Sequence, residues 1–416
     1  MKFKSSYILG LIIFILNIVL SHLFYSESNS FTLSTILIII DIISVGILCA
    51  NKKEDKKLYF IIFLGLIIRT LLMYFELYGR NIYILPNSGR DTEAFYKIPF
   101  TKNFGELNGY FLFVKILALL FCKQRLMFQF FNVFLSTLVP LIILKIFNKL
   151  ELGNKAKLIG ITLACLLPSN MIISSELLRE ELMIFINTCS LYFLIKWYKK
   201  SNSIDFIISI LLLVLSSYFH SSMIISIFGY FFAYIFLNKN RTKIIVSYKT
   251  VGKLLFSIII FIILYRLFYS YINSYFLNIG DLDYLNDKLS YYTEGNSVYL
   301  SSFAHISSFT GLIITSPIKF IYLYSSPVPW EWKGFTDILI FMCSSIFYIY
   351  PYLKFYKYKK NKLITILIII VTIIGFTYGL SCFSTGSAMR HREKAFPYFC
   401  LLIPLLINEK GDKNEI

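Results

Sequence analysis

Apolar runs of about twenty residues recur along the whole chain and are separated by short polar stretches. Each run is long enough to cross a hydrocarbon core roughly 30 Å thick as an α-helix. The pattern predicts twelve spans, near residues 6–24, 32–50, 58–78, 126–147, 157–174, 181–198, 203–219, 222–238, 250–272, 336–354, 362–381 and 394–408. We therefore predict an all-α, polytopic integral membrane protein.

The distribution of charged residues predicts the orientation of these spans in the membrane. With the N-terminus inside, the inner loops read NKKEDKK, KIFNKLELGNKAK, KWYKK, NKNRTK and KFYKYKKNK, short and rich in lysine as cytoplasmic loops are. Both termini are then cytoplasmic. Abundant Lys, Ile, Asn, Tyr and Phe are typical of an AT-rich bacterial genome, so we expect the bacterial plasma membrane. The net charge of +18 lies mostly in these loops, where anionic membrane lipid is the expected partner and nucleic acid is not.

Two apolar stretches, 107–122 and 303–325, would invert the downstream charge pattern if they crossed the membrane. We predict that they are amphipathic or re-entrant segments on the outer side, where irregular backbone is tolerated under protein cover. They belong to two long outer segments, 79–125 and 273–335, whereas every inner loop is short. The outer face therefore carries the long segments between spans.

The arginines follow a different distribution from the lysines. Of nine arginines, eight lie within the membrane or on the outer face, whereas twenty-four of the thirty-two lysines lie inside. A guanidinium group binds phosphate oxygens in a two-point manner that an ammonium group cannot reproduce. The distribution predicts an anionic, phosphate-bearing ligand at the outer surface.

The first outer segment contains a candidate base. Asp91 lies between Arg90 and the nearby Glu93 in the stretch SGRDTEAFY. A carboxylate just above the bilayer is suited to accept a proton from an attacking hydroxyl group. The alternative is a solvated loop with an ion pair of little energetic value.

A second candidate cluster lies between the fifth and sixth spans, in SSELLREE. On a continuous helix Glu176 and Glu180 share one face, with Arg179 adjacent, so the cluster would suit a pyrophosphate together with a metal ion or hydroxyl group. The alternative is a helix N-terminus with acidic residues that complement the helix dipole.

The remaining candidates lie in turns at the outer ends of later spans. His220 lies at the tip of a tight hairpin, where it is either a structural group or a second candidate base. The stretch GSAMRHREK places Arg390, His391 and Arg392 in the densest outer cationic patch of the chain. A helix beginning near Ala388 would add backbone amides to this anion-binding field. The alternative is that this loop faces the cytoplasm.

Ionisable residues within the spans need partners. Asp41 and Arg69 lie at similar depths in adjacent spans and are predicted to neutralise each other. Arg266, near the outer end of a later span, is predicted either to face the ligand or to extend to the interface.

The layout resembles the GT-C superfamily of polyprenyl-phosphate-dependent glycosyltransferases and the related Wzy-type polysaccharide repeat-unit polymerases. Asp91 followed by 107–122 is similar to the first outer loop of that superfamily, and Glu176 or Glu180 to its second acidic position. The stretches PSN…SELLRE and GSAMRHREKAFPYF are similar to segments of capsular polymerases. The likeness covers residues 58–408 in layout but only about thirty residues in motif.

The resemblance implies a glycosyltransferase or polymerase that extends a surface polysaccharide from a polyprenyl-(pyro)phosphate-linked donor, with other polysaccharide-assembly proteins as further partners. It divides the chain into two N-terminal helices (1–57), a GT-C-like catalytic module (58–335) and a C-terminal part with the Arg/His cluster (336–416). The expected bases are Asp91, Glu180 and His220; the expected phosphate ligands are Arg179, Arg266, Arg390 and Arg392; further substrate contacts are Arg90, Glu93, Glu176 and His391. No metal ligand is assigned, although the Asp91-x-Glu93 spacing leaves Mg²⁺ or Mn²⁺ open as a cofactor. The alternative functions are a flippase for lipid-linked oligosaccharide, with a cavity lined by Asp41, Arg69 and Arg266, and an O-acyltransferase.

Overall fold

The computed structural model describes residues 5–50, 56–236, 308–358, 361–382 and 384–411, together with single positions between 252 and 287. These residues form helices joined by short turns, and no strand occurs among them. Within this part, five helices are long and apolar enough to cross a membrane: Ser30–Ala50, Lys56–Tyr78, Arg125–Leu150, Phe335–Tyr358 and Lys362–Leu380. The bent pair Asn154–Leu166 and Pro168–Ser175 is a sixth candidate. The fold is thus all-helical, with the apolar helices of an integral membrane protein.

The chain forms two compact units, and each is described by itself. Unit 1 consists of Met1–Leu141 and Ile161–Phe185, and unit 2 of Ile142–Gly160 and Ile186–Ile416. The boundaries between the units fall within helices α6 (Arg125–Leu150), α7 (Asn154–Leu166) and α9 (Glu180–Lys200). The predicted division at residues 57 and 335 rests on topology and stays a prediction.

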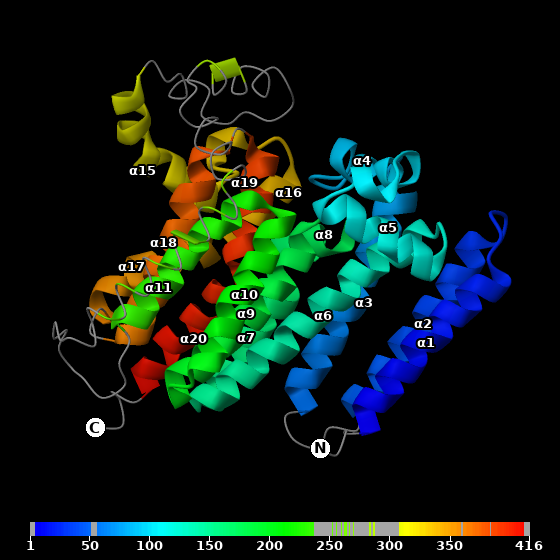
Figure 1. Cartoon of the computed structure of the whole chain (residues 1–416), viewed down its shortest axis with the longest axis horizontal. Coiled ribbons are helices and arrows are strands. Elements are labelled where there is room, and N and C mark those ends of the chain that lie inside the picture. The colour runs from blue at the N-terminus through cyan, green and yellow to red at the C-terminus, as the bar shows by residue number, and fades with distance from the viewer. Residues whose placement is uncertain are drawn as a thin grey trace. The chain divides into compact units, whose positions relative to one another are not determined.

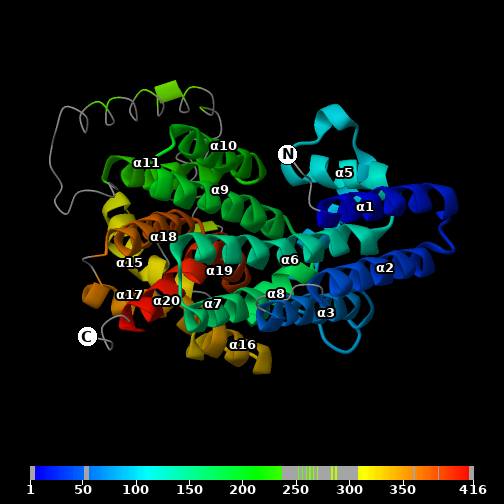
Figure 2. The same cartoon turned by 90° about the horizontal axis from the view of Figure 1, so that it is seen from below.

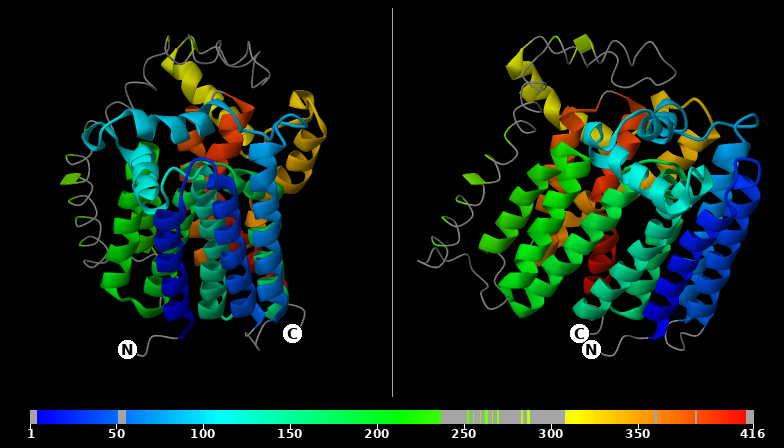
Figure 3. Two further views of the ribbon diagram at one scale, coloured as in Figure 1. Left: turned by 90° about the vertical axis from the view of Figure 1, so that its right-hand side faces the viewer. Right: turned by 45° about the vertical axis from the view of Figure 1, so that its right-hand side comes forward.

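Unit 1 is built on apolar helices that run side by side, α1 (Ser5–Phe24), α2 (Ser30–Ala50) and α3 (Lys56–Tyr78) (Figure 3). The broken pair α7 and α8 (Pro168–Ser175) bends by 43° at Leu167, because Pro168 cannot continue the hydrogen-bond ladder of α7. Helix α8 packs against α3. The expected span 157–174 is therefore two helices.

The first outer segment predicted from the sequence forms α4 (Arg90–Thr101), a short 3₁₀ turn η1 (Phe104–Glu106) and α5 (Gly109–Phe121). Both helices lie at the end of unit 1 where α1 joins α2 (Figure 3). Lys115 Nζ donates to Pro99 O over 2.8 Å, which fastens α5 to α4. With 13 residues, α5 is well short of a membrane crossing.

Unit 2 surrounds the buried helix α18 (Lys362–Leu380) (Figures 1 and 2). Asn361 caps this helix by accepting hydrogen bonds from the amides of Leu363 and Ile364. The other elements of unit 2 are α10 (Ser203–Phe219), η2 (Ser221–Ile225), α11 (Ser226–Phe236), α15 (Phe309–Ser325), η3 (Pro329–Glu331), α16 (Phe335–Ile340), the π turn η4 (Phe341–Ser345), α17 (Ile346–Tyr358), α19 (Thr385–Arg392), η5 (Glu393–Ala395) and α20 (Phe396–Gly411). Helix α17 ends just before α18 begins, and α19 follows the end of α18. The C-terminal end of α17, which carries lysines, therefore lies at the opposite end of α18 from α19.

Two glycines on one face of α18 allow α15 to approach it closely. A Cβ atom at Gly375 would lie 2.5 Å from the Phe320 ring and 2.6 Å from the Tyr324 ring, and one at Gly379 would lie 3.1 Å from Lys319 O. Small residues four positions apart are a common means of bringing membrane helices together. This contact places the middle of α15 against the last turn of α18.

Candidate functional site

Four side chains from three parts of unit 2 meet at the end of α18, to which one of them, Tyr378, belongs. The His220 ring lies 5.2 Å from the Tyr378 ring and 5.2 Å from the His391 ring, centroid to centroid. His391 stacks on Tyr378 at 4.9 Å, and Lys394 Nζ lies 4.7 Å from the centre of the Tyr378 ring. We call His220, Tyr378, His391 and Lys394 the aromatic–cation cluster.

The local sequence explains how each member reaches the cluster. His220 ends α10 and begins η2, with an extended backbone, so its side chain lies at the junction of the two helices. Ser384 starts α19 by accepting a hydrogen bond from Ser387 N, and eight residues later the chain turns into η5. Lys394 Nζ lies 2.6 Å from His391 Nδ1. Because an ammonium group only donates, His391 Nδ1 is the acceptor in this pair.

The two predicted phosphate ligands on α19 differ in exposure. Arg392 is fully buried, and its Nη1 donates to Ser326 O, at the end of α15. Its guanidinium group also lies 5.2 Å from the Tyr348 ring of α17. Arg392 thus ties α15 and α17 to α19, and its phosphate role stays a prediction. Arg390 is half-buried, which makes it the more accessible of the two.

Lys319 is a cation that the sequence analysis passed over. It is the only charged residue in α15, and its residue surface is 1% exposed. Among the described residues its Nζ has no hydrogen-bond partner. The signal was a single lysine within an otherwise apolar helix that had been assigned to the outer side.

The acidic cluster of unit 1 is arranged differently from the prediction of one continuous helix. Glu176 ends α8 with an extended backbone, whereas Glu180 begins α9, so the expected shared helical face is wrong. Asn132 donates to Glu176 O at 2.9 Å and to Leu178 O at 2.8 Å, which holds the intervening turn. Acidic residues occupy the first turn of α9, as the helix-dipole interpretation predicted. Arg179 is half-buried, with Nε 3.8 Å from Glu180 Oε1.

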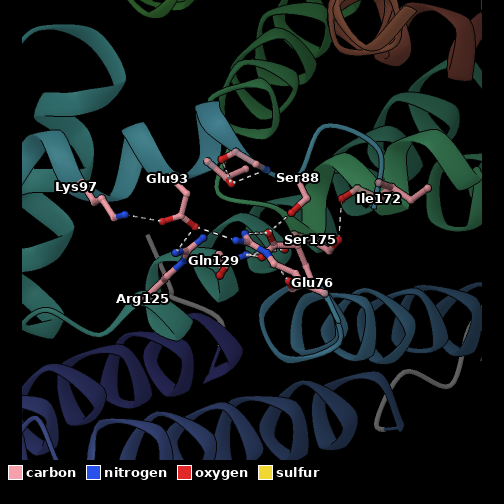
Figure 4. A network of polar contacts seen from close by, with 11 residues as sticks. Glu76, Ser88, Glu93, Lys97, Arg125, Gln129, Ile172 and Ser175 are labelled. Atoms are coloured by element: carbon pink, nitrogen blue, oxygen red, sulfur yellow. Dashed lines mark hydrogen bonds and ion pairs between the residues drawn. The ribbon is translucent and has the colours of Figure 1, made fainter. Parts of the chain in front are cut away.

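A second polar network in unit 1 surrounds Glu93 (Figure 4). Arg125 Nη1 lies 2.7 Å and Arg80 Nη1 3.0 Å from Glu93 Oε1. Arg80 also pairs with the buried Glu76, whose carboxylate accepts a bond of 2.8 Å from Gln129 Nε2. The sequence analysis named Glu93 and missed Arg80 and Arg125, which flank the outer segment at the ends of α3 and α6.

Burial opposes ionisation of Glu93, but the hydrogen bonds and charges of Arg125 and Arg80 outweigh it and lower the pKa of this carboxyl group. We expect Glu93→Gln to lower the free energy of unfolding by about 1 kcal/mol at pH 7, since the carboxylate is partly exposed. A carboxyl group whose pKa is lowered by folding stabilises the folded state at pH values above its pKa in the unfolded state. This stabilisation is lost as the pH falls through the folded-state pKa, so the difference in stability between Glu93→Gln and wild type shrinks in acid. Unfolding titrations at pH 7 and pH 4 measure it. Glu27→Gln, at an exposed glutamate, is the control; an equal effect there would contradict this prediction.

The other predicted residues are more dispersed. Asp91 is exposed in the first turn of α4, and the side chain of Arg90 lies outside the described part. Arg266 is an exposed helical residue whose immediate neighbours are not described. The predicted pairing of Asp41 with Arg69 is wrong: Asp41 accepts two bonds of 2.9 Å from Asn17, and Arg69 binds the α7–α8 break.

The described residues contain no group of three or more His, Cys, Asp or Glu side chains that is arranged to hold a metal ion. In the Asp91-x-Glu93 pair, Glu93 already accepts from two guanidinium groups. These residues do not fit a Mg²⁺ or Mn²⁺ site, which needs several free carboxylate or carbonyl oxygens.

No protein-family model matches the sequence, and a comparison with curated proteins finds no match. The fold itself defines an all-helical membrane protein with a lysine and three aromatic rings clustered at the end of one buried helix.

Proposed function

We propose that this protein is an integral membrane glycosyltransferase of the repeat-unit polymerase type, with the twelve-span, GT-C-like layout expected from its sequence. Its donor is a sugar or oligosaccharide on polyprenyl (pyro)phosphate at the outer face of the bacterial plasma membrane, and its product is an extended surface polysaccharide. The observation that best supports this proposal is the aromatic–cation cluster, together with Arg390, which lies on the same short helix α19 as His391. Cations suit a phosphate group, and aromatic rings suit the apolar face of a sugar.

The reaction is a displacement at the anomeric carbon of the donor. An acceptor hydroxyl oxygen forms the new bond to that carbon, the bond from carbon to phosphate oxygen breaks, and a base takes the hydroxyl proton. The leaving phosphate gains negative charge, which Arg390 stabilises, while a phosphate role for Arg179, in unit 1, stays a prediction. A guanidinium group that is already in place at that moment lowers the barrier without reorganising solvent.

Three residues remain candidates for the base: Asp91, Glu180 and His220. His220 contacts the rings of His391 and Tyr378, and His391 lies on the same helix as Arg390. A neutral imidazole accepts a proton through its unprotonated ring nitrogen, as a general base must. Glu180 lies beside Arg179, and Asp91 is exposed on α4.

The flippase alternative draws less support from the described residues. It requires Arg69 to face a central cavity, yet Arg69 is buried and donates to main-chain and side-chain acceptors of α7 and α8. A cavity of about 150 Å³ in unit 1 is lined by Asp41 and Asn17, but most of its lining is aromatic or aliphatic. None of the described residues that line this cavity is a cation that could hold a lipid phosphate.

Deletion of the gene tests the proposal. We expect surface polysaccharide to be lost and single repeat units to accumulate on the lipid carrier, since assembly of each unit proceeds without the polymerase. Mass spectrometry of extracted lipid-linked oligosaccharide measures this. Truncated units would instead indicate a transferase for one sugar, and unchanged glycan with no accumulated intermediate would reject the proposal.

A further inference from the structure

Lys319 lies in a buried position, where a charged amino group lowers the stability of the folded protein. It is buried in the middle of α15, with its backbone against the last turn of α18, and its Nζ has no hydrogen-bond partner among the described residues. An ammonium group taken out of water without compensation opposes folding. Burial accordingly lowers the pKa of Lys319 to about 8. Such a side chain is well suited to a ligand that supplies the missing negative charge.

Helix α15, which carries this lysine, packs against α19. Cys382 connects the two: its Sγ lies 3.5 Å from Ser387 Oγ in the first turn of α19, and it interacts electrostatically with Lys319. The first-turn amides of a helix have no acceptors within the helix and favour anions. Ser384 satisfies the amide of Ser387, and the amide of Gly386 precedes it in the same turn.

The charged groups that act on Cys382 are all cations: Lys394, Lys319 and Arg390. The thiol does not neutralise them, because burial raises the pKa of Cys382 to about 12. Glu393, the acidic neighbour of Lys394 in the chain, interacts electrostatically with Arg392 and Tyr348. The surroundings of Cys382 are therefore positive.

We infer that Lys319 and the first turn of α19 form a binding site for a phosphate group, with Arg390 at its edge. A tetrahedral phosphate offers enough oxygens to bind the ammonium group, the helix amides and a guanidinium group together, whereas a carboxylate has only two. The inference deepens the proposed function and rests on it for the source of the phosphate, which is the headgroup of a lipid-linked donor or its released product. In this site Lys319 is the buried residue that binds the negative charge of the phosphate, while Arg390 binds it at the edge.

Lys319→Met tests this site in the full-length protein, purified into nanodiscs. Methionine keeps the length of the side chain and removes the charge. We expect the variant to unfold at a higher temperature than wild type, because an uncompensated buried charge is gone. We also expect phosphate to stabilise wild type and to bind the variant about 10-fold to 100-fold more weakly, as for loss of one charge-assisted hydrogen bond. Lys333→Met, the same change at an exposed lysine in unit 2, is the matched control and should bind like wild type.

The probes are inorganic phosphate and pyrophosphate, each against chloride at equal ionic strength, and nanodiscs with or without undecaprenyl phosphate. A Lys319-dependent response to the lipid alone assigns the phosphate to a lipid headgroup, and a response to the inorganic ions assigns it to free phosphate, which the proposed reaction does not release. Equal binding by Lys319→Met and wild type, or no response of wild type to any probe, would overturn the inference. Unfolding of both Lys319→Met and Lys319→Gln would overturn it too, since an unpartnered charge is not needed for folding.

The binding test is independent of polymer formation. Phosphate binding through Lys319 in a protein whose deletion leaves the glycan unchanged would reject the proposed function and keep this site. Normal polymer from Lys319→Met, together with phosphate binding equal to that of wild type, would reject the site and keep the function.

Discussion

Replacing Arg390 by alanine abolishes the surface polymer while the protein stays in the membrane at its normal level. This is the largest functional effect we expect. Arg390 is half-buried on α19, the helix that also carries His391, and it acts electrostatically on the buried Cys382. Loss of a group that stabilises charge in the transition state slows reactions by ~100-fold or more. Gel analysis of surface polysaccharide, with immunoblots of the membrane fraction, measures both quantities.

Two further variants sharpen this experiment. Arg390→Lys keeps the charge but loses two-point binding, so we expect it to recover only part of the polymer. Lys333→Ala removes a cation from an exposed site in unit 2 and should leave the polymer unchanged. Arg392 is less suitable for such a test, because its bond to Ser326 O makes loss of folding the first consequence of its removal. Full-length polymer from cells that carry Arg390→Ala would remove Arg390 from the proposed mechanism.

The sequence predicted the helices well wherever a long apolar run was enough to define them. The expected spans 6–24, 203–219 and 362–381 correspond to Ser5–Phe24, Ser203–Phe219 and Lys362–Leu380. Length and hydropathy suffice in these cases, because in lipid the backbone can satisfy its hydrogen bonds only within a helix. The described part contains five full-length candidate spans or six, so the count of twelve stays a prediction.

Departures from regular helix were harder to predict. Pro168 was visible as a helix breaker, yet the run 157–174 still reads as one span, since its apolar character continues across the break. The π turn at Phe341–Ser345 lies within the run 336–354, and a change of hydrogen-bond register leaves no mark on hydropathy.

The candidate site was predicted as separate residues rather than as contacts. His220 and His391 were each identified, but their ring contact depends on the end of α10 reaching the segment after α18. Lys319 was missed because a sequence does not show that a lysine in a short apolar helix is buried without a partner. Tyr378, an ordinary aromatic residue near the end of a span, gave no signal at all.

Arg69 gives the clearest case of a wrong pairing with a physical cause. The sequence offered Asp41 as its partner, but a guanidinium group has five donors and one carboxylate cannot satisfy them all. At the break between α7 and α8, carbonyl groups lack the N–H donors that a further helical turn would supply. Arg69 donates to Cys165 O at 2.6 Å and to Ala164 O at 3.2 Å, and so caps the end of α7.

We expect Arg69→Met to lower the free energy of unfolding by about 3–5 kcal/mol, the largest effect on stability in the described part of the chain. Besides the two carbonyl groups, Nε donates to Ser174 Oγ and Nη2 to Asn170 Oδ1, each at 2.9 Å. Methionine fills much of the space but satisfies none of these four buried acceptors, and an unsatisfied polar group in an apolar surrounding is costly. Unfolding titrations in mixed micelles measure the loss.

The same substitution at Arg80 separates this capping role from the general cost of removing an arginine. Arg80 is partly exposed and forms ion pairs with Glu76 and Glu93. We expect Arg80→Met to cost about 1 kcal/mol, because the exposed guanidinium group is already solvated in part. Arg69→Lys should fall between the two, since an ammonium group has three donors and no planar fork. Equal stability of Arg69→Met and Arg80→Met would mean that the broken helix holds its bend without Arg69, and that this buried charge is retained for a reason other than capping.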